Sequence, residues 1–494
     1  MMPKAIVIGA GIAGIAASLR LKAQGFEVEV HEANPYTGGK LHAISQDGYR
    51  FDLGPSLFTM PQFVEELFAL FGEDVTTHFE YIQKEVICNY FWSDGTTFSA
   101  KSDKQEYIEE LCATFGESPK KVTAFLNRNK EKYELTAPLF LENSLHKIHT
   151  YLNTNTIKSI AQLYKLHIFQ SLDKTAKAYF KNTKTVQLVN RYATYNGSNP
   201  YKTPGIMSLI PHLEQYYGTF FPKGGMHRIS QSLYELGLRQ NISYHLNSKV
   251  SSILTEKGRA VGIELENGEQ RKADLVICNM DVFPTYKQLL ATHKAPEKTL
   301  AQERSSSALI FYWGIEKSFP NLDLHNIFFS DDYRNEFEHL FDKKSICDDP
   351  TVYVNISSKD NPEDAPKNCE NWFVMINAPA HYNQDWNALV QKTRVNILRK
   401  LSKILNTDIE ALIATEYILE PSGIEKNTSS YRGALYGAAS NDTMAAFLRH
   451  PNFNKKIKNL YHCGGSVHPG GGIPLCMLSA KIVSDLVQHD FNTQ

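Results

Sequence analysis

Three glycines near the start of the chain are spaced to bind a phosphate group. Gly9, Gly11 and Gly14 form the pattern Gly-x-Gly-x-x-Gly, after a short apolar run that predicts a strand and before a run of good helix formers. In such a turn the first glycine permits the bend, the second lets the backbone approach a pyrophosphate, and the third lets the helix pack closely on the strand. The helix start, with Ile12 and Ala13, then offers N–H groups and a positive dipole end. The pattern predicts a dinucleotide site.

An acidic residue stands where the ribose of that dinucleotide is expected. Glu32 ends the predicted second strand, at the distance from the glycines where a carboxylate hydrogen-bonds a ribose hydroxyl. Its charge also argues against a ligand that carries a 2′-phosphate at this position. We therefore expect Glu32 and the adjacent Ala33 to contact the nucleotide.

The rest of the chain offers few other recognisable catalytic patterns. No Ser/His/Asp, Cys/His or paired-carboxylate arrangement stands out, and the seven cysteines never form Cys-x-x-Cys. We expect no disulfide framework and no metal site, and the cysteine usage is typical of a reducing compartment. No second Gly-x-Gly-x-x-Gly opens another βαβ unit, which disfavours a nicotinamide-dependent reductase.

Composition narrows the class of protein further. The chain has 494 residues, 42% of them hydrophobic, and a formal net charge of −1, which indicates two or three folded units and no affinity for nucleic acid. The apolar stretch 5–19 is interrupted by glycines and is too short to span a bilayer. We expect a cytoplasmic protein without a signal peptide or a transmembrane helix.

Four further segments resemble those of a known family. Segment 34–40, which contains Gly38-Gly39-Lys40, resembles the second glycine signature of the amine-oxidase-like flavoproteins. Segments 52–56 and 221–226 resemble elements of the carotenoid desaturases, and segment 459–474 closely resembles their terminal flavin-binding motif. The chain is similar throughout to carotenoid desaturases of the bacterial phytoene-desaturase type. Gly464-Gly465-Ser466-Val467, where many phytoene desaturases carry Gly-Ala-Gly-Thr, looks more like the hydroxycarotenoid 3,4-desaturase branch.

This resemblance implies FAD as the cofactor and assigns residues to it. Val250 resembles the family position whose backbone meets the adenine, or else is an ordinary strand valine. The amino end of a helix over 475–487 is expected to face the flavin ring. With the residues of the opening turn, the cofactor-binding residues are expected to be Glu32, Ala33, Gly38, Gly39, Lys40, Gly54, Pro55, Ser56, Val250, Asn279, Met280, Gly464, Gly465, Gly472, Ile473 and Pro474.

The implied reaction is desaturation of an acyclic, 1-hydroxylated carotenoid, with hydride transfer to the flavin and reoxidation by a membrane quinone or oxygen. Segment 190–201 resembles a family segment near the substrate, so Tyr195 and Tyr201 are candidate substrate contacts. Arg191 is a candidate polar contact for the ring or a substrate hydroxyl, or else a structural arginine. His468 is a candidate proton relay, or else a residue that only positions the backbone.

The fold implied is α/β, with a Rossmann-type, glutathione-reductase-like FAD domain that is discontinuous in sequence. We assign residues 1–75, 220–284 and 440–494 to this domain. Alternating apolar positions in 248–280, broken by Lys257-Gly258 and Asn267-Gly268, independently predict hairpins before a buried returning strand. Residues 76–110 and 285–439 are expected to form a mixed-sheet substrate domain, with a helix over 387–405, and residues 111–219 a helical, membrane-facing lid.

The region 137–190 suggests how a lipid-soluble substrate arrives. It holds many more lysines than acids, and its apolar residues are candidate membrane anchors. The alternative is a solvated helical lid with an ordinary core face. The anchors are Leu139, Phe140, Leu141, Leu163, Leu166, Ile168 and Phe169.

Several rival functions share the expected architecture. A phytoene desaturase or a carotenoid isomerase would use the same cofactor, the isomerase without net oxidation. A protoporphyrinogen oxidase or an amine oxidase belongs to the same superfamily. An amine oxidase would need an aromatic cage before the flavin motif, which Tyr431 and Tyr436 alone do not establish. A binding protein like the GDP-dissociation inhibitors would hold no flavin, which the intact Gly38-Gly39 pair and carboxyl-terminal motif argue against.

Overall fold

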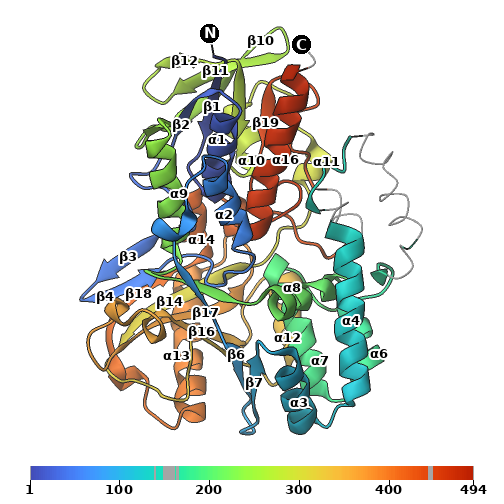
Figure 1. The fold of residues 1–494 in the computed structure, drawn as a ribbon. Coiled ribbons are helices and arrows are strands. Elements are labelled where there is room, and N and C mark those ends of the chain that lie inside the picture. Colours follow the sequence, from blue (N-terminus) through green and yellow to red (C-terminus); the bar gives the residue numbers. More distant parts are fainter. Residues whose placement is uncertain (1, 138–140, 148–161, 163–165, 443–448, 493–494) are drawn as a thin grey trace.

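The computed structural model describes residues 2–137, 141–147, 162, 166–442 and 449–492. One part of the molecule is built on a parallel five-stranded sheet in the order β19-β13-β1-β2-β9 (Figure 1). The strands are β1 (Lys4–Ile8), β2 (Glu27–His31), β9 (Ser243–His245), β13 (Leu275–Cys278) and β19 (Leu460–His462). Strands from three distant parts of the chain thus share one sheet, as expected for a discontinuous dinucleotide-binding domain.

Each face of this sheet is covered by a different layer. One face packs against three helices, α1 (Ile12–Ala23), α9 (His227–Arg239) and α16 (Ile473–Asn492). The other packs against a small antiparallel sheet of β10 (Val250–Glu256), β11 (Arg259–Leu265) and β12 (Gln270–Lys272). The predicted hairpins are therefore confirmed, and their inward residues, including Ile253 and Ile263, bury the underside of the parallel sheet.

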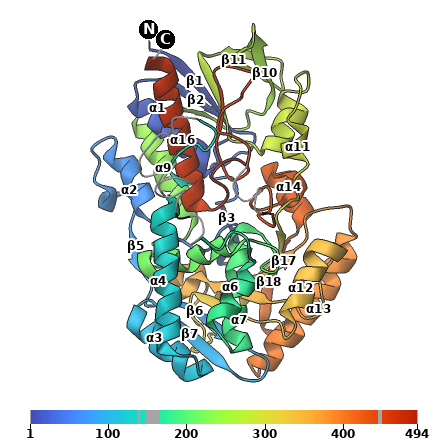
Figure 2. The ribbon, with the colours of Figure 1, turned by 90° about the vertical axis from the view of Figure 1, so that its right-hand side faces the viewer.

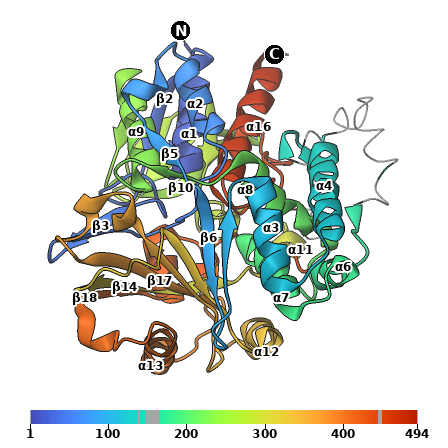
Figure 3. The same cartoon turned by 60° about the horizontal axis from the view of Figure 1, so that its bottom comes forward.

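A seven-stranded mixed sheet forms the base of the other part of the molecule, at the lower left of Figure 1. In spatial order its strands are β18 (Ile413–Leu419), β14 (Ser307–Ile315), β17 (Glu370–Ala378), β16 (Val352–Ile356), β15 (His325–Phe328), β6 (Val86–Phe91) and β7 (Thr97–Lys101). Helix α13 (Trp386–Ile404) covers its outer face, as Figure 3 shows, and the predicted helix over 387–405 is confirmed. The other face is left to wall a cavity.

Helices from the middle of the chain close the molecule on the side opposite this sheet (Figure 2). They are α3 (Lys104–Phe115), α4 (Pro119–Thr136), α6 (Leu172–Tyr179), α7 (Thr183–Asn190) and α8 (Ile210–Tyr217), with the short turns η5 (Arg191–Asn196) and η6 (Gly205–Leu209). No helix among the described residues is both long and apolar enough to cross a membrane.

The candidate membrane anchors differ in how exposed their side chains are. Leu139, Phe140 and Leu163 lie outside the described residues. Leu166 is buried, so it packs inside the protein, whereas the side chain of Phe169 is 90% exposed. Leu141 and Ile168 are half-buried.

The remaining strands and α-helices connect these layers. They are β3 (Ala43–Gln46), β4 (Tyr49–Asp52), β5 (Tyr81–Gln83), β8 (Phe220–Pro222), α2 (Gln62–Ala69), α10 (Val282–Pro284), α11 (Glu297–Leu300), α12 (Tyr333–Glu338) and α14 (Pro421–Thr428).

Candidate active site

The glycine turn between β1 and α1 has the close contacts its pattern predicts. Gly11 is the N-cap of α1, and as a glycine it has no side chain that could cap the helix. A Cβ on Gly14 would lie 2.0 Å from the Gly9 carbonyl oxygen, so only glycine fits there. Gly9 itself has a φ of +93°, which disfavours any other residue. The uncapped helix start is therefore open to an anion.

Glu32 and the second glycine pair meet the same turn. The Glu32 Oε2 atom accepts a hydrogen bond of 2.8 Å from the Ala10 N–H, and Gly38 N–H donates to the Ala10 carbonyl oxygen at 2.8 Å. A Cβ on Gly39 would approach the Gly11 Cα to 3.4 Å. The two glycine segments, which were predicted separately, thus form one wall of the expected nucleotide site.

The carboxylate of Asp52 joins segments 52–56 and 221–226, which resemble elements of the carotenoid desaturases. Asp52 accepts hydrogen bonds from the Met226 and His227 N–H groups at 2.8 and 2.9 Å, which caps the start of α9. It also forms an ion pair of 2.8 Å with Arg50. Gly225 has a φ of +89°, and its Cβ would lie 2.6 Å from an Asp52 carboxylate oxygen, which explains the glycine in that motif.

Asn279, just beyond β13, connects the first turn to the carboxyl-terminal motif. Its Nδ2 lies 3.4 Å from the Gly9 carbonyl oxygen, and its Oδ1 would be 2.7 Å from a Cβ on Gly464. The Gly464 N–H donates to Ser479 Oγ on α16 at 3.1 Å. Because β13 lies between β1 and β19, one side chain at its end can contact both turns.

Two cations lie near this motif, the half-buried Lys40 and the buried Arg449. Lys40 Nζ donates to the Leu435 carbonyl oxygen at 3.1 Å, and burial lowers its pKa. Arg449 donates to the carbonyl oxygens of Tyr436 and Ala438 at 2.7 and 2.9 Å, and burial lowers its pKa to about 10. Together with the amino end of α16, they favour negative charge on a ring bound here.

One cavity of about 900 Å³ runs past both glycine segments, Asn279, Lys40 and the carboxyl-terminal motif. Every predicted cofactor residue except Gly14 lines it. It continues between the seven-stranded sheet and the helices, where its walls are mostly apolar. That second part is lined by residues that include Tyr133, Ile206, Met207, Ile210, Leu213, Ile310, Ile327, Phe373 and Met375.

The first part of the cavity fits FAD. Glycines of both segments line the cavity with backbone alone, the helix start is uncapped, and Glu32 is placed for a ribose. The residues that would hold the pyrophosphate are Gly11, Ile12 and Ala13. Val250, His31 and Ser248 line the cavity beyond Glu32 and would face the adenosine end.

A buried polar cluster interrupts the apolar part of the cavity. Arg191 Nη1 donates to the Tyr195 hydroxyl at 2.6 Å, and its guanidinium lies over the rings of Tyr192, Tyr195 and Tyr90 at 4.3, 5.0 and 5.2 Å. Glu214 on α8 pairs with Arg191 at 3.5 Å and accepts hydrogen bonds from the hydroxyls of Tyr192 and Tyr195. Burial raises the pKa of Tyr195 well above its usual value, so its phenol stays neutral.

Arg191, Tyr195 and Glu214 line the cavity, although Arg191 is only 5% exposed and Glu214 2%. Tyr201 is not among the lining residues of the cavity. Its ring packs beneath Arg334, at 4.0 Å, and against Phe337.

His468 also lines the cavity but is 3% exposed. Its Nε2 lies 2.9 Å from the Asn143 carbonyl oxygen, which can only accept, so Nε2 carries the proton. Burial lowers the pKa of His468 to about 4, so the ring is neutral near pH 7. It is a weak base.

Several residues that line this site were not predicted. Glu214 is the one acidic residue of α8, in the region predicted as a helical lid. His325, Tyr353 and Ser56 form a chain in which the tyrosine hydroxyl lies 2.7 Å from His325 Nδ1 and 2.8 Å from Ser56 Oγ. Of these three only Ser56 was predicted, because β15 and β16 carry no recognisable motif.

Comparison with known proteins agrees with this geometry. The family model described as flavin containing amine oxidoreductase matches residues 12–488. The chain is 59% identical over 488 residues to a 1-hydroxycarotenoid 3,4-desaturase from a Flavobacterium strain, covering 99% of each protein. It is 31% identical over 495 residues to a 4,4'-diapolycopene oxygenase from a Methylomonas species, covering 99% of the chain and 98% of the relative.

Among solved structures, the cyclohexylamine oxidase of Brevibacterium oxydans matches with a TM-score of 0.64 at 15% identity, over 100% of both chains. At that identity the likeness concerns the fold, and it supports the predicted Rossmann-type domain with a separate substrate domain. With the match over nearly the whole sequence and a cavity that fits the cofactor, the chain is an FAD-dependent oxidoreductase that belongs to the flavin-containing amine oxidoreductase family.

Proposed function

We propose that this enzyme introduces a double bond into an acyclic carotenoid that carries a 1-hydroxy group. The observation that carries the proposal is the continuous cavity, in which the flavin-binding turns open into an apolar space with one buried polar cluster. The names of the relatives agree with it, since the relative with 59% identity is a 1-hydroxycarotenoid 3,4-desaturase.

The apolar walls suit a hydrocarbon chain. They come from α4, η6, α8 and the inner face of the seven-stranded sheet, and burying apolar surface there favours binding by about 25 cal/mol per Å². An amine substrate would instead bring a cation into this space, which is costly because Glu214, the acid of the polar cluster there, is already paired with Arg191.

The polar cluster supplies the contact for a hydroxyl. A hydroxyl both donates and accepts, and the cluster offers Arg191 and Tyr195 as donors and Glu214 as an acceptor. Arg191 Nε is buried and has no hydrogen-bond partner within the described chain, so the cluster retains donor capacity. A site built to bond a hydroxyl discriminates strongly against the analogue that lacks it.

Desaturation removes a hydride equivalent and a proton from adjacent carbons. Bound FAD supplies the hydride acceptor. The conjugated chain delocalises the charge left behind, so the proton becomes acidic and a weak base suffices. His468, neutral and with its proton on Nε2, is our candidate for carrying that proton.

We further propose that the substrate enters from a membrane surface, and that a quinone or oxygen reoxidises the enzyme. Support for membrane contact comes from Phe169, which is 90% exposed in the lysine-rich region 137–190. The domain boundaries proposed from the sequence, with 111–219 as the lid, fit this arrangement of helices around the cavity.

The test compares products in cells that make acyclic carotenoids with or without a 1-hydroxy end group. Loss of two hydrogen atoms, with a red-shifted absorption spectrum, is expected only for the hydroxylated chain. Repeated loss of hydrogen from phytoene would instead assign the enzyme as a phytoene desaturase. An unchanged mass with altered double-bond geometry would assign it as an isomerase.

A matched pair of variants tests the role of the cluster. Tyr195→Phe removes one hydroxyl but keeps the ring beside Arg191, and it should lower kcat/KM for the hydroxylated chain about 10-fold. Tyr179→Phe makes the same change on α6, outside the cavity, and should have little effect. Equal effects of Tyr195→Phe on hydroxylated and unhydroxylated substrates would contradict hydroxyl recognition by this cluster.

A further inference from the structure

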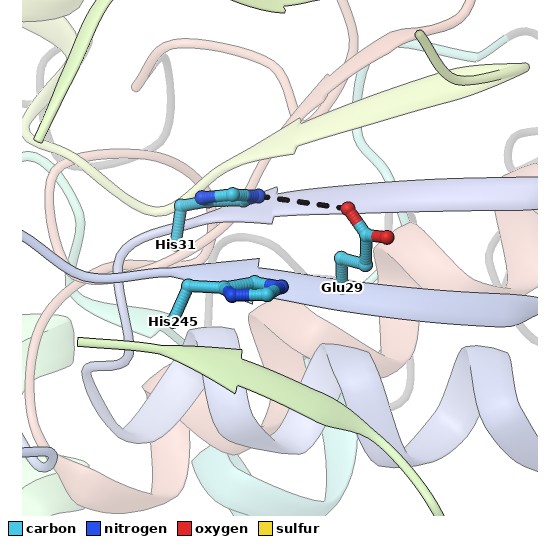
Figure 4. A group of neighbouring side chains, drawn as sticks. All are labelled: Glu29, His31 and His245. Atoms are coloured by element: carbon cyan, nitrogen blue, oxygen red, sulfur yellow. Dashed lines mark ion pairs between the residues drawn. The ribbon is translucent and has the colours of Figure 1, made fainter. Parts of the chain in front are cut away.

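Three side chains of metal-binding type meet on the parallel sheet, next to the cofactor cavity. Glu29 and His31 belong to β2, and His245 faces His31 from the edge strand β9 in direct register (Figure 4). One ligand atom from each residue lies within 4.8 Å of the others. Among the described residues this is the only group of three or more acidic, histidine or cysteine side chains so arranged.

The atoms that face one another are buried and lack hydrogen bonds. Within the part of the chain that the structure describes, Glu29 Oε2, His31 Nε2 and His245 Nε2 have no hydrogen-bond partner, and His31 is only 2% exposed. Glu29 Oε2 and His31 Nε2 are 3.7 Å apart. Since a buried polar atom without a partner is costly, three such atoms together indicate a missing ligand.

The opposite atoms of two of these side chains are held by neighbours. His31 Nδ1 lies 2.8 Å from Ser248 Oγ, and Lys4 Nζ lies 2.7 Å from Glu29 Oε1. When His31 Nδ1–H donates to the serine, the Nε2 lone pair points toward Glu29 (Figure 4). Metal-binding histidines and carboxylates are commonly oriented by such outer contacts.

We propose that Glu29, His31 and His245 bind one divalent transition metal ion of the zinc class, with water as the fourth ligand. Imidazole and carboxylate ligands suit Zn²⁺ better than Ca²⁺ or Mg²⁺. Zinc–ligand bonds of about 2.1 Å in a tetrahedron separate the ligand atoms by about 3.4 Å. The observed separation of 3.7 Å is already close, and the widest, under 4.8 Å, closes through small side-chain rotations.

Nearby charges set the strength of the site. Lys4 and Arg271 oppose a cation, although Lys4 is paired with Glu29, and Arg271 with Glu269 at 2.8 Å. We therefore expect the site to bind transition metals but not alkaline-earth ions.

The ion would link β2 to β9 beneath the adenosine end of the cavity. His31 and Ser248 line that cavity, and Glu32 follows His31 directly. The proposed site differs from the expectation of no metal site, because that expectation rested on the spacing of the cysteines. His31 and His245 are far apart in sequence and meet only through the pairing of β2 with β9.

The test is a zinc titration of untagged, FAD-loaded, full-length protein that has been treated with a chelator. One Zn²⁺ should bind per chain by calorimetry and elemental analysis, and Co²⁺ should give the intense visible absorption of a tetrahedral site. His245→Gln and Glu29→Gln should weaken binding at least 100-fold. His489→Gln, on the exposed end of α16, should not change it.

The FAD content of each variant, from its flavin absorbance, verifies the fold. His245→Gln is the more informative histidine variant, since His245 does not line the cavity. The proposal is overturned if no saturable zinc binding occurs. It is overturned equally if His245→Gln and Glu29→Gln retain FAD and bind zinc as tightly as the unaltered protein.

Discussion

The ion pair between Arg191 and Glu214 allows a quantitative prediction about the cavity wall. Both side chains are almost fully buried, so bulk water solvates neither partner well. Glu214→Gln keeps the shape of the side chain but leaves the arginine charge without its counter-ion. Breaking a buried pair in this way costs about 3–5 kcal/mol. The contact is long, at 3.5 Å, and Arg191 keeps its stacking on three tyrosine rings, so we expect the lower end, about 3 kcal/mol.

Hydrogen exchange followed by mass spectrometry measures this cost where it arises. In FAD-loaded protein, peptides from η5 and α8 should exchange on the order of 100-fold faster in Glu214→Gln. Tyr192→Phe removes one hydroxyl that donates to Glu214 at 2.8 Å, and should cost about half as much.

The double variant Arg191→Met, Glu214→Gln supplies the control. It removes both charges, so its cost should fall below the sum of the two single costs by about 2 kcal/mol. Additive costs, or a Glu214→Gln effect below about 0.5 kcal/mol as for a surface residue, would refute the buried pair.

Three further predictions concern other parts of the molecule. Gly14→Ala places a Cβ 2.0 Å from the Gly9 carbonyl oxygen, so the variant should purify with little or no FAD, as its flavin absorbance would show. His450 is 4% exposed, and burial lowers its pKa to about 4, below that of the unfolded chain. Its contribution to stability is present above about pH 6.5 and is lost as the pH falls toward 4. In His450→Gln, the slope of the unfolding free energy against pH in that window should therefore decrease by up to about 1.4 kcal/mol per unit. Phe169→Glu should reduce binding to anionic lipid vesicles in a sedimentation assay, and unchanged binding would count against contact through this residue.

Local sequence patterns predicted the turns and hairpins whose conformation is set by residues adjacent in the chain. The turn from β1 to α1 needs glycines at fixed spacing, and the hairpin from β10 to β11 needs Lys257-Gly258, so both are readable from the chain. The terminal motif was also readable, although α16 begins at Ile473 and extends to Asn492, beyond the predicted range.

Contacts between segments that are distant in the sequence could not be predicted from local patterns. Asp52 was part of a recognised motif, yet its role as the cap of α9 appears only when β4 and α9 are brought together. Glu214 belongs to no motif, and its function follows from lying beside Arg191. Tyr201 shows the converse, since its segment matched a family pattern while the chain turns its ring toward Arg334.

Anaerobic mixing of the FAD-loaded enzyme with a 1-hydroxylated acyclic carotenoid tests the central claim most directly. We predict that the flavin absorbance bleaches in a single turnover, and that one equivalent of substrate loses two hydrogen atoms by mass spectrometry. A flavin that stays oxidised while the carotenoid binds unchanged, or changes only its double-bond geometry, would contradict the account.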